Sequence, residues 1–394
     1  MINFTYHNPT KLIFGKDAEA QLGEELLFWG AKRVMVVYDM NIDKVGNLQE
    51  RIRSALSSVD LYVVEKGGVQ PNPRVELVNE CVALGKKENI DFLLAVGGGS
   101  VIDTCKAAAL ALSSGLDDAW PIYSGEYVPT STLPVGVVLT ICASGSESSW
   151  TSVITNEELQ LKRSFTRDFI RPKFAVMNPE VCRTLPKFHK ACGVVDTMMH
   201  TMDRYFSSVG ECTELTDAIG EALLRTVIKY GPLYYNEPDN YNAQAQIMWA
   251  SNLSHNGLTG CGLASDWACH QIEHEISGVY DVAHGAGLTA IWGSWARYVS
   301  KDDPSKFARY ARNVWGVSET DDAKAALCGI EKTEVFFQSL GLPLSIADLG
   351  MGVIPDDVLL DMADKAVFHG ARTTGNYRVL DATGVADILR MANQ

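Results

Sequence analysis

Basic charge, long apolar runs and paired cysteines are all scarce in this sequence. It has 34 lysine and arginine residues and 48 aspartate and glutamate residues, so its formal net charge is −14. Surfaces that bind nucleic acid or anionic membranes need basic patches that displace counterions from phosphate. We therefore expect no nucleic-acid partner and no membrane partner, and we interpret the acidic balance as a solubilising surface.

The sequence also lacks targeting and disulfide signals. No run of about eighteen uncharged apolar residues occurs, and the opening segment MINFTYHNPTKLIFG has no apolar stretch of signal-peptide length. Nine cysteines lie between Cys81 and Cys328, with an odd total and no C-x-x-C pair. This pattern favours reduced thiols over a secreted disulfide framework. We expect a cytoplasmic protein whose cysteines are small core residues.

The length of the chain and its hydrophobic periodicity predict two domains. A chain of 394 residues is longer than a typical single domain, since domains contain roughly 150 to 200 residues. The first 180 residues alternate strand-like and helix-like segments, and after about Pro179 the 3.6-residue helical period dominates. We predict an α/β Rossmann-like nucleotide domain at residues 1–180 and an all-α metal-binding domain at residues 181–394.

Apolar, β-branched runs in the first half predict buried strands, at Val34–Tyr38, Leu61–Glu65, Phe92–Val96 and Val135–Thr140. Segments between them place apolar residues at helical spacing, at Leu48–Leu56, Val75–Lys87 and Val101–Leu112. Strands that alternate with helices predict a parallel sheet.

The third predicted strand leads into three glycines and a serine, in the segment LLAVGGGSVIDTCK. Glycine lets the backbone approach a pyrophosphate closely, and the free N–H groups at the start of the next helix stabilise its charge. The alternative is a tight strand-to-helix turn without a ligand, since the pattern is neither G-x-G-x-x-G nor the lysine-bearing phosphate loop. The glycines alone support both interpretations equally.

Two further strand ends carry polar residues. Asp39 ends the run VMVVYD, where a carboxylate can accept hydrogen bonds from both hydroxyls of a ribose and would repel a 2′-phosphate. This favours NAD over NADP, and the alternative is that Asp39 only caps the next turn. The segment TICASGSE at Thr140–Glu147 places small hydroxyl residues where they suit the lining of a cofactor cleft.

Four of the eight histidines have a spacing that suits a metal site: His200, His270, His274 and His284. Asp196 and His200 are four residues apart, as are His270 and His274, so on a helix each pair projects from one face. Three imidazoles and one carboxylate can hold a divalent metal and leave a position open for an oxygen ligand. The alternatives are hydrogen-bonded core histidines and an ordinary Asp–His pair on a helix. The absence of H-E-x-x-H speaks against a metalloprotease.

Several ordered motifs together resemble the iron-containing, or group III, alcohol dehydrogenases, and within them the butanol dehydrogenase branch. These motifs are NPTKLIFG, GGVQPNP at Gly67–Pro73, GGGSVIDTCK at Gly97–Lys106, TICASGSE, GVVDTMMH at Gly193–His200 and the block Asp266–Gly285. The likeness covers nearly the whole chain. It implies a dehydroquinate-synthase-like fold and a metal-dependent, NAD(P)-linked enzyme that interconverts a small primary alcohol and its aldehyde, such as butanol and butanal.

The resemblance also implies roles for individual residues. It places the metal on Asp196, His200, His270 and His284. It places His274 beside the nicotinamide, where this residue would orient substrate or relay a proton, with a packing role as the alternative. Cofactor contacts are implied at Asp39, Gly97, Gly98, Ser100, Asp103, Thr140, Ser144 and Lys162.

Two positions depart from the family's pattern. Ser144 stands where the family commonly has threonine, which keeps the hydroxyl. Asp39 stands where NADP-preferring members of this branch tend to carry glycine, so we expect NAD rather than NADP. The resemblance further implies one divalent ion, iron(II) or zinc, and a homodimer.

Rival functions share the same scaffold. One is a glycerol-dehydrogenase-like polyol oxidoreductase, and another is a dehydroquinate-synthase-like lyase, which needs a more polar pocket than the stretches around Trp150 and Trp267 suggest. A third is a non-catalytic nucleotide-binding protein. An intact set of one aspartate and three histidines speaks against it, because burying those groups without a metal would be costly.

Overall fold

The structure, a computed structural model, describes residues 1–394, which form two compact units. The first, here called the sheet unit, comprises His7–Pro186 and Glu237–Asn256. The second, the helical unit, comprises Met1–Tyr6, Lys187–Asn236 and Gly257–Gln394. The predicted domain boundary at residues 180 and 181 remains a prediction, since this grouping is defined by packing and interleaves the two halves of the chain.

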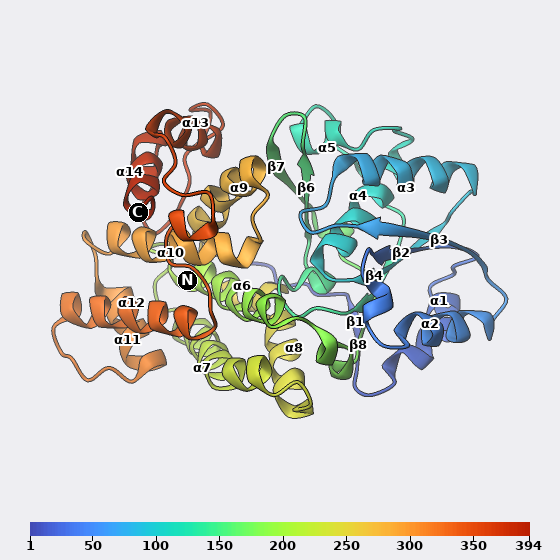
Figure 1. Cartoon of the computed structure of the whole chain (residues 1–394), viewed down its shortest axis with the longest axis horizontal. Helices are drawn as coiled ribbons and strands as arrows, with labels where there is room; N and C mark the ends of the chain where they lie inside the picture. The colour runs from blue at the N-terminus through green and yellow to red at the C-terminus, as the bar shows by residue number, and fades with distance from the viewer. The chain divides into compact units, whose positions relative to one another are not determined.

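A six-stranded parallel sheet forms the centre of the sheet unit (Figure 1). Its order is β1-β8-β5-β4-β2-β3, and every neighbouring pair is parallel. All residues of β4 and β5 are buried, as expected for a parallel sheet covered on both faces. The strands are β1 (Lys11–Phe14), β2 (Arg33–Asp39), β3 (Tyr62–Val69), β4 (Phe92–Gly97), β5 (Val135–Leu139) and β8 (Phe174–Met177).

Helices cover both faces of this sheet. Figure 1 shows α3 and α4 on one side of the strands and α1 and α2 on the other. From β2 the chain continues outward to β3, whereas from β4 it continues in the opposite direction to β5. Such a reversal brings the carboxyl ends of neighbouring strands together around an open crevice. The helices are α1 (Leu22–Phe28), α2 (Leu48–Ser57), α3 (Val75–Lys87), α4 (Gly99–Ser114) and α5 (Trp120–Ser124).

Two further elements complete the sheet unit. An antiparallel hairpin joins β6 (Thr151–Asn156) to β7 (Leu161–Thr166). The helix α8 (Tyr241–His255) comes from later in the chain and packs against the short 3₁₀ helix Pro179–Thr184 that follows β8.

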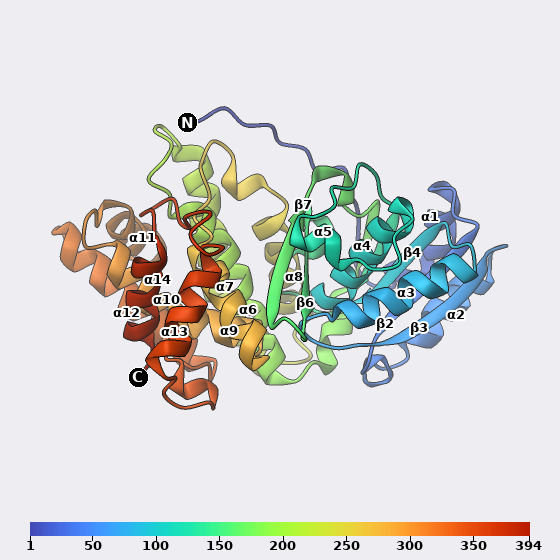
Figure 2. The ribbon, with the colours of Figure 1, turned by 90° about the horizontal axis from the view of Figure 1, so that it is seen from above.

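The helical unit contains no strand of the named sheets, and Figure 2 shows its helices packed against one another. Aspartates cap two of them, since Asp321 accepts a hydrogen bond from the Lys324 N–H and Asp381 from the Gly384 N–H. The helices are α6 (Lys187–Tyr205), α7 (Glu214–Asn236), α9 (Ala268–Tyr280), α10 (His284–Val299), α11 (Ser305–Trp315), α12 (Asp322–Ser339), α13 (Asp356–Ala366) and α14 (Ala382–Ala392).

Aromatic side chains fill part of the core of the helical unit. Phe206, just after α6, stacks on Phe307 of α11 with ring centroids 4.1 Å apart. The Trp295 ring of α10 contacts both of these rings. Such pairs add to the stabilisation that comes from burying the rings themselves. None of the helices is both long enough and apolar enough to span a bilayer.

The predicted fold class is confirmed, and so are the four predicted strands and three predicted helices. The strands β1 and β8 and the β6–β7 hairpin were not predicted. β1 and β8 have only four residues each, and β1 has a single buried residue among them, so β1 carries little of the hydrophobic pattern that identifies a strand.

Candidate metal centre and nucleotide-binding edge

Three helices of the helical unit bring together the side chains predicted to bind a metal. Asp196 and His200 lie one turn apart on α6, His270 lies in the first turn of α9, and His284 is the first residue of α10. Asp196, His200 and His270 are buried, whereas the His284 side chain is 26% exposed. One side of the cluster is therefore open to a ligand.

The ligand atoms of Asp196, His270 and His284 lie within 4.8 Å of one another. Asp196 Oδ1 is 3.8 Å from His270 Nε2 and 3.7 Å from His284 Nε2. Asp196 Oδ1 and His270 Nε2 are both buried, and neither makes a hydrogen bond to a group outside the cluster of aspartate and histidines. Buried polar atoms are almost always partnered, so these two fit a site built for a cation, and nitrogen and carboxylate oxygen suit a divalent first-row metal.

The other two predicted histidines stand beside this group. His200 Nδ1 is 3.0 Å from Asp196 Oδ1 and 2.9 Å from the Asp196 carbonyl oxygen, and its ring centroid is 4.5 Å from that of His270. His200 thus adjoins the three grouped ligands, and its place as a fourth ligand remains a prediction. His274 is half-buried one turn beyond His270, with its ring centroid 5.9 Å from that of His284.

Two buried carboxylates behind the histidines were missed by the sequence analysis. Asp203 lies against His270 Nδ1, and Glu273 lies against His284 Nδ1. A carboxylate on Nδ1 fixes the tautomer that leaves Nε2 free to bind a metal. The spacing offered a signal, because Asp203 follows His200 by three residues and Glu273 follows His270 by three, which places each near a ligand on its helix.

The electrostatics of the cluster follow from burial and close charges. Burial opposes ionisation of Asp196, but the neighbouring His200 and His270 outweigh it and hold the pKa of Asp196 well below its usual range. Burial lowers the pKa of His200. Burial also disfavours charge on His270, yet Asp203 and Asp196 raise its pKa to about 9.

The indole of Trp267 forms a wall of the cluster. Its ring centroid lies 5.3 Å from that of His270 and 5.9 Å from that of His200, and the Arg204 guanidinium lies 4.5 Å from its centre. The Trp267 backbone has a φ of 65°, which is unfavourable for a large side chain and is found most often at functional sites.

The glycine segment of the sheet unit turns from β4 into α4 at the carboxyl edge of the sheet. A methyl group on Gly97 would overlap the Val101 side chain, and one on Gly99 would lie 2.5 Å from Ser144 Oγ. No side chain caps the start of α4, so its first N–H groups are available to an anion. Glycine is therefore required here for close packing, and the resulting cradle fits a phosphate.

The two predicted carboxylates at this edge differ. Asp39 is half-buried at the end of β2 and its Oδ1 accepts a hydrogen bond from the Asn41 N–H at 2.7 Å, so the turn-capping role is present. In Asp103, Oδ1 accepts from Ser146 Oγ at 2.6 Å and Oδ2 from the Val153 N–H at 2.9 Å. Asp103 thus holds the loop after β5, and the cofactor contacts of both residues remain predictions.

The remaining predicted residues lie around the same loop. Thr140 and Lys162 are buried, and the Lys162 ammonium donates to Asn72 Oδ1 at 3.1 Å. The buried Lys106, which was not predicted, donates to the carbonyl oxygens of Ser146, Ser149 and Thr151 at 2.8, 3.1 and 2.8 Å. Lys106 anchors the loop that also carries Ser144. Ser100, in the first turn of α4, is half-buried.

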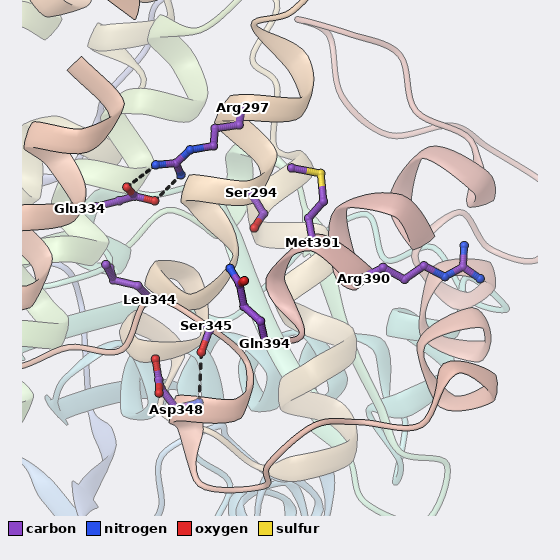
Figure 3. A pocket seen from close by; sticks show the side chains of 9 residues that line it. All are labelled: Ser294, Arg297, Glu334, Leu344, Ser345, Asp348, Arg390, Met391 and Gln394. Carbon is purple, nitrogen blue, oxygen red and sulfur yellow. Dashed lines mark hydrogen bonds and ion pairs between the residues drawn. The ribbon is translucent and has the colours of Figure 1, made fainter. Parts of the chain in front are cut away.

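A cavity of about 830 Å³ opens elsewhere in the helical unit (Figure 3). In it Arg297 and Glu334 form an ion pair, and the Asp348 N–H approaches Ser345 Oγ. None of the residues predicted to bind metal or cofactor lines this cavity. Arg297 is neutralised by Glu334, and Arg390 by Asp356 outside the cavity lining. We therefore assign no ligand to it.

Comparison with known families gives two adjoining matches. Residues 9–179 match the model of the iron-containing alcohol dehydrogenases, and residues 190–393 match that of the C-terminal part of the Fe-containing alcohol dehydrogenase family. The junction between them falls close to the end of the long first segment of the sheet unit.

Individual relatives match along their full length. The chain is 42% identical over 393 residues to a probable NADH-dependent butanol dehydrogenase of Bacillus subtilis, with 99% of each chain covered. It is 35% identical to an NADPH-dependent aldehyde reductase of Escherichia coli, with 95% of each covered. The crystal structure of an NADH-dependent butanol dehydrogenase from Thermotoga maritima superposes with a TM-score of 0.93, at 34% identity, and covers 100% of this chain and 99% of that one.

Proposed function

The chain belongs to the iron-containing alcohol dehydrogenase family, and we propose that it interconverts a small primary alcohol and its aldehyde with NAD(H). The observation that carries this proposal is the group formed by Asp196, His270 and His284, in which the buried atoms Asp196 Oδ1 and His270 Nε2 have close polar neighbours only within the cluster. We assign His200, which adjoins this group, as the fourth ligand of one divalent ion.

The residues of the helical unit would prepare the substrate oxygen for reaction. A divalent ion held by these four side chains supplies Lewis-acid stabilisation of negative charge on that oxygen. Asp203 and Glu273 orient two of the imidazoles, and Trp267 limits access of water from its side. His274 is half-buried next to His284, and we assign to it the transfer of a proton between the substrate hydroxyl and solvent.

The residues of the sheet unit would hold the cofactor, whose nicotinamide supplies the hydride chemistry. Gly97, Gly98 and Ser100 receive the pyrophosphate at the start of α4. Asp39 receives the adenosine ribose at the end of β2 and repels a 2′-phosphate. We therefore propose NAD as the preferred cofactor, in keeping with the NADH dependence named for the Bacillus and Thermotoga relatives.

The names of the relatives also suggest the substrate and the metal. Butanol and butanal are the substrates we propose first, because two of the relatives are described as butanol dehydrogenases. We propose iron(II) or zinc as the ion, since three imidazoles and a carboxylate suit both. A homodimer is proposed from the frequency of two-fold assemblies, and light scattering on the purified chain would test it.

Paired kinetics test the proposed function. The full chain is stripped of metal, reloaded with iron(II) under anaerobic conditions or with zinc, and assayed with NADH and NADPH on short aldehydes that include butanal. We expect turnover of butanal and a preference for NADH of about tenfold or more in kcat/KM. Oxidation of glycerol in preference to butanol would favour the polyol oxidoreductase, and no turnover of any aldehyde or alcohol would contradict the proposal.

A further inference from the structure

We propose that Glu273 is a positioning residue that fixes the His284 ring and thereby sets how long the site retains a divalent cation. The proposal rests on the metal site of the proposed function and adds a residue to it. Glu273 is fully buried on α9, three residues after the ligand His270. It lies behind the ligands rather than among them.

Both carboxylate oxygens of Glu273 are engaged by neighbours on the metal side of α9. One lies against His284 Nδ1, and the other accepts a hydrogen bond from Ser277 Oγ. With a carboxylate on Nδ1, the proton of a neutral imidazole resides there. The Nε2 lone pair is then directed towards the ligand group, where Nε2 lies 3.7 Å from Asp196 Oδ1.

Two glycines in the first turn of α10 make room for the contact between Glu273 and His284. A methyl group on Gly287 would lie 2.8 Å from Glu273 Cγ and 3.0 Å from Glu273 Oε1. One on Gly285 would lie 2.6 Å from the Cys192 carbonyl oxygen of α6. The two glycines of the segment HGAG therefore allow α10 to approach both α6 and the Glu273 side chain, which places His284 within reach of Asp196.

His284 needs such support more than the other imidazoles. Its side chain is 26% exposed, against 7% for His270 and 5% for His200. It begins a helix, whereas His200 lies inside α6 and is held by the carbonyl oxygen of its own helix. Without Glu273, the His284 ring would be free to rotate towards solvent, and ordering it would oppose metal binding.

Burial of a carboxylate is itself informative. Removing a carboxylate from water costs several kcal/mol unless its new partners compensate. An imidazole that carries the positive charge of a bound cation is a stronger partner than a neutral one, so Glu273 gains most when the site is loaded. Carboxylates of this kind commonly contribute about 10- to 100-fold to metal affinity.

The test measures zinc retention in the full-length, zinc-loaded protein. Glu273→Ala, Glu273→Gln and Ser277→Ala are compared with Glu334→Gln, a control that removes a carboxylate paired with Arg297 far from the ligands in sequence. Zinc transfer to a chromophoric chelator gives the release rate, and competition with the chelator gives the affinity. Cobalt(II) loading adds an absorption spectrum that reports ligand geometry.

We expect zinc affinity to fall about 10- to 100-fold in Glu273→Ala. Glu273→Gln should fall less, because its amide oxygen still accepts from Nδ1, and Ser277→Ala less again. The cobalt bands should shift in both Glu273 variants, while NADH affinity and the Glu334→Gln control stay within twofold of wild type.

Release and affinity within twofold of wild type in folded Glu273→Ala and Glu273→Gln would overturn the proposal. If Glu273→Ala does not fold, Glu273→Gln is judged alone. Zinc release and affinity within twofold of wild type, together with an unshifted cobalt spectrum, would then overturn the proposal. A wild-type chain that binds neither zinc nor iron(II) stoichiometrically would instead contradict the proposed function, so the two failures are distinguishable.

Discussion

The candidate metal centre of the helical unit and the candidate nucleotide-binding edge of the sheet unit place their functional groups by different means. At the nucleotide edge, backbone turns follow the ends of β2, β4 and β5, and the key residues of each turn are contiguous in sequence. At the metal centre, side chains from α6, α9 and α10 converge on one point. The first depends on local chain geometry and the second on helix packing.

This difference determines which substitutions matter in each unit. The nucleotide edge relies on the absence of side chains, since a methyl group would collide with Val101 at Gly97 and with the Ser144 hydroxyl at Gly99. The metal centre relies on the presence of charged groups, including Asp203 and Glu273 behind the histidines. A change in one unit should therefore leave the function of the other intact. Three experiments examine this separation, and a fourth examines the stability of the sheet unit.

The largest effect is expected from removing a ligand. Asp196→Ala or His284→Ala should reduce bound metal from about one ion per chain to a small fraction and lower kcat by about 1,000-fold or more, because the substrate oxygen loses its stabilising charge. Elemental analysis and aldehyde reduction measure the two effects. His189→Ala, an exposed histidine on the same helix, is the control, and metal content equal to wild type in Asp196→Ala would refute the assigned site.

A smaller but specific effect is expected at the glycine turn. Gly99→Ala places a methyl group 2.5 Å from Ser144 Oγ, so the Ser144 hydroxyl must move and the added methyl stands at the proposed pyrophosphate turn; NADH affinity should fall about tenfold or more. Fluorescence titration with NADH measures the affinity, and zinc content should not change. Gly67→Ala, where a methyl group meets nothing within 4 Å, should behave as wild type. Unaltered NADH binding in Gly99→Ala would show that the cofactor does not use this turn.

Cofactor choice separates the charge of Asp39 from its role in the turn. Asp39→Asn keeps an oxygen that can accept from the Asn41 N–H but removes the charge that repels a 2′-phosphate. We expect the ratio of kcat/KM for NADH over NADPH to fall about tenfold with little change in thermal stability. The exposed Asp43→Asn in the next turn is the control. A ratio unchanged in Asp39→Asn would leave Asp39 with the turn-capping role alone.

The smallest effect concerns stability and pH. Burial lowers the pKa of Lys106 to about 8 from its usual 10.5, against the opposing attraction of Asp103. Between these values the unfolded chain holds a proton that the folded chain has released, so Lys106 makes the free energy of unfolding rise with pH. The slope is at most about 1.4 kcal/mol per pH unit.

Urea denaturation at pH 8 and pH 10 measures this dependence. The stability of wild type minus that of Lys106→Met should increase between the two pH values, whereas the same difference for the largely exposed Lys87→Met should not. Lys106→Met should also be less stable at both pH values, because buried carbonyl oxygens lose N–H donors whether the amine is charged or neutral. A flat difference for Lys106→Met would mean that Lys106 titrates in the folded protein as it does in the unfolded chain.

Much of the sheet unit could be predicted because its signals are local. Runs such as Phe92–Gly97 are wholly buried and apolar, and a parallel strand of this kind is recognisable from a short window of sequence. The segment Glu237–Asn256 shows the limit of that approach. Its helix, α8, packs against the segment that follows β8, and such a pairing depends on contacts between segments far apart in the chain.

The candidate metal ligands could be predicted from the sequence, but the carboxylates that hold their imidazole rings could not. The spacing of Asp196 and His200 indicates one helix face, and the resemblance assigned His270 and His284. Asp203 and Glu273 escaped notice because a carboxylate near a histidine on a helix is common and becomes meaningful only once its oxygen meets Nδ1. The Lys106 anchor was missed for the same reason, since its three acceptors are backbone carbonyl groups.

By itself, the sequence determined the alternation of strands and helices, the acidic surface charge, and the donor atoms available to a metal and a cofactor. Only the tertiary structure decided which imidazoles converge on Asp196 and which carboxylates stand behind them. The physical reason lies in how helices pack. The direction of a side chain follows from its own helix, but the distance between side chains on different helices depends on how closely the helices approach, which Gly285 and Gly287 permit here.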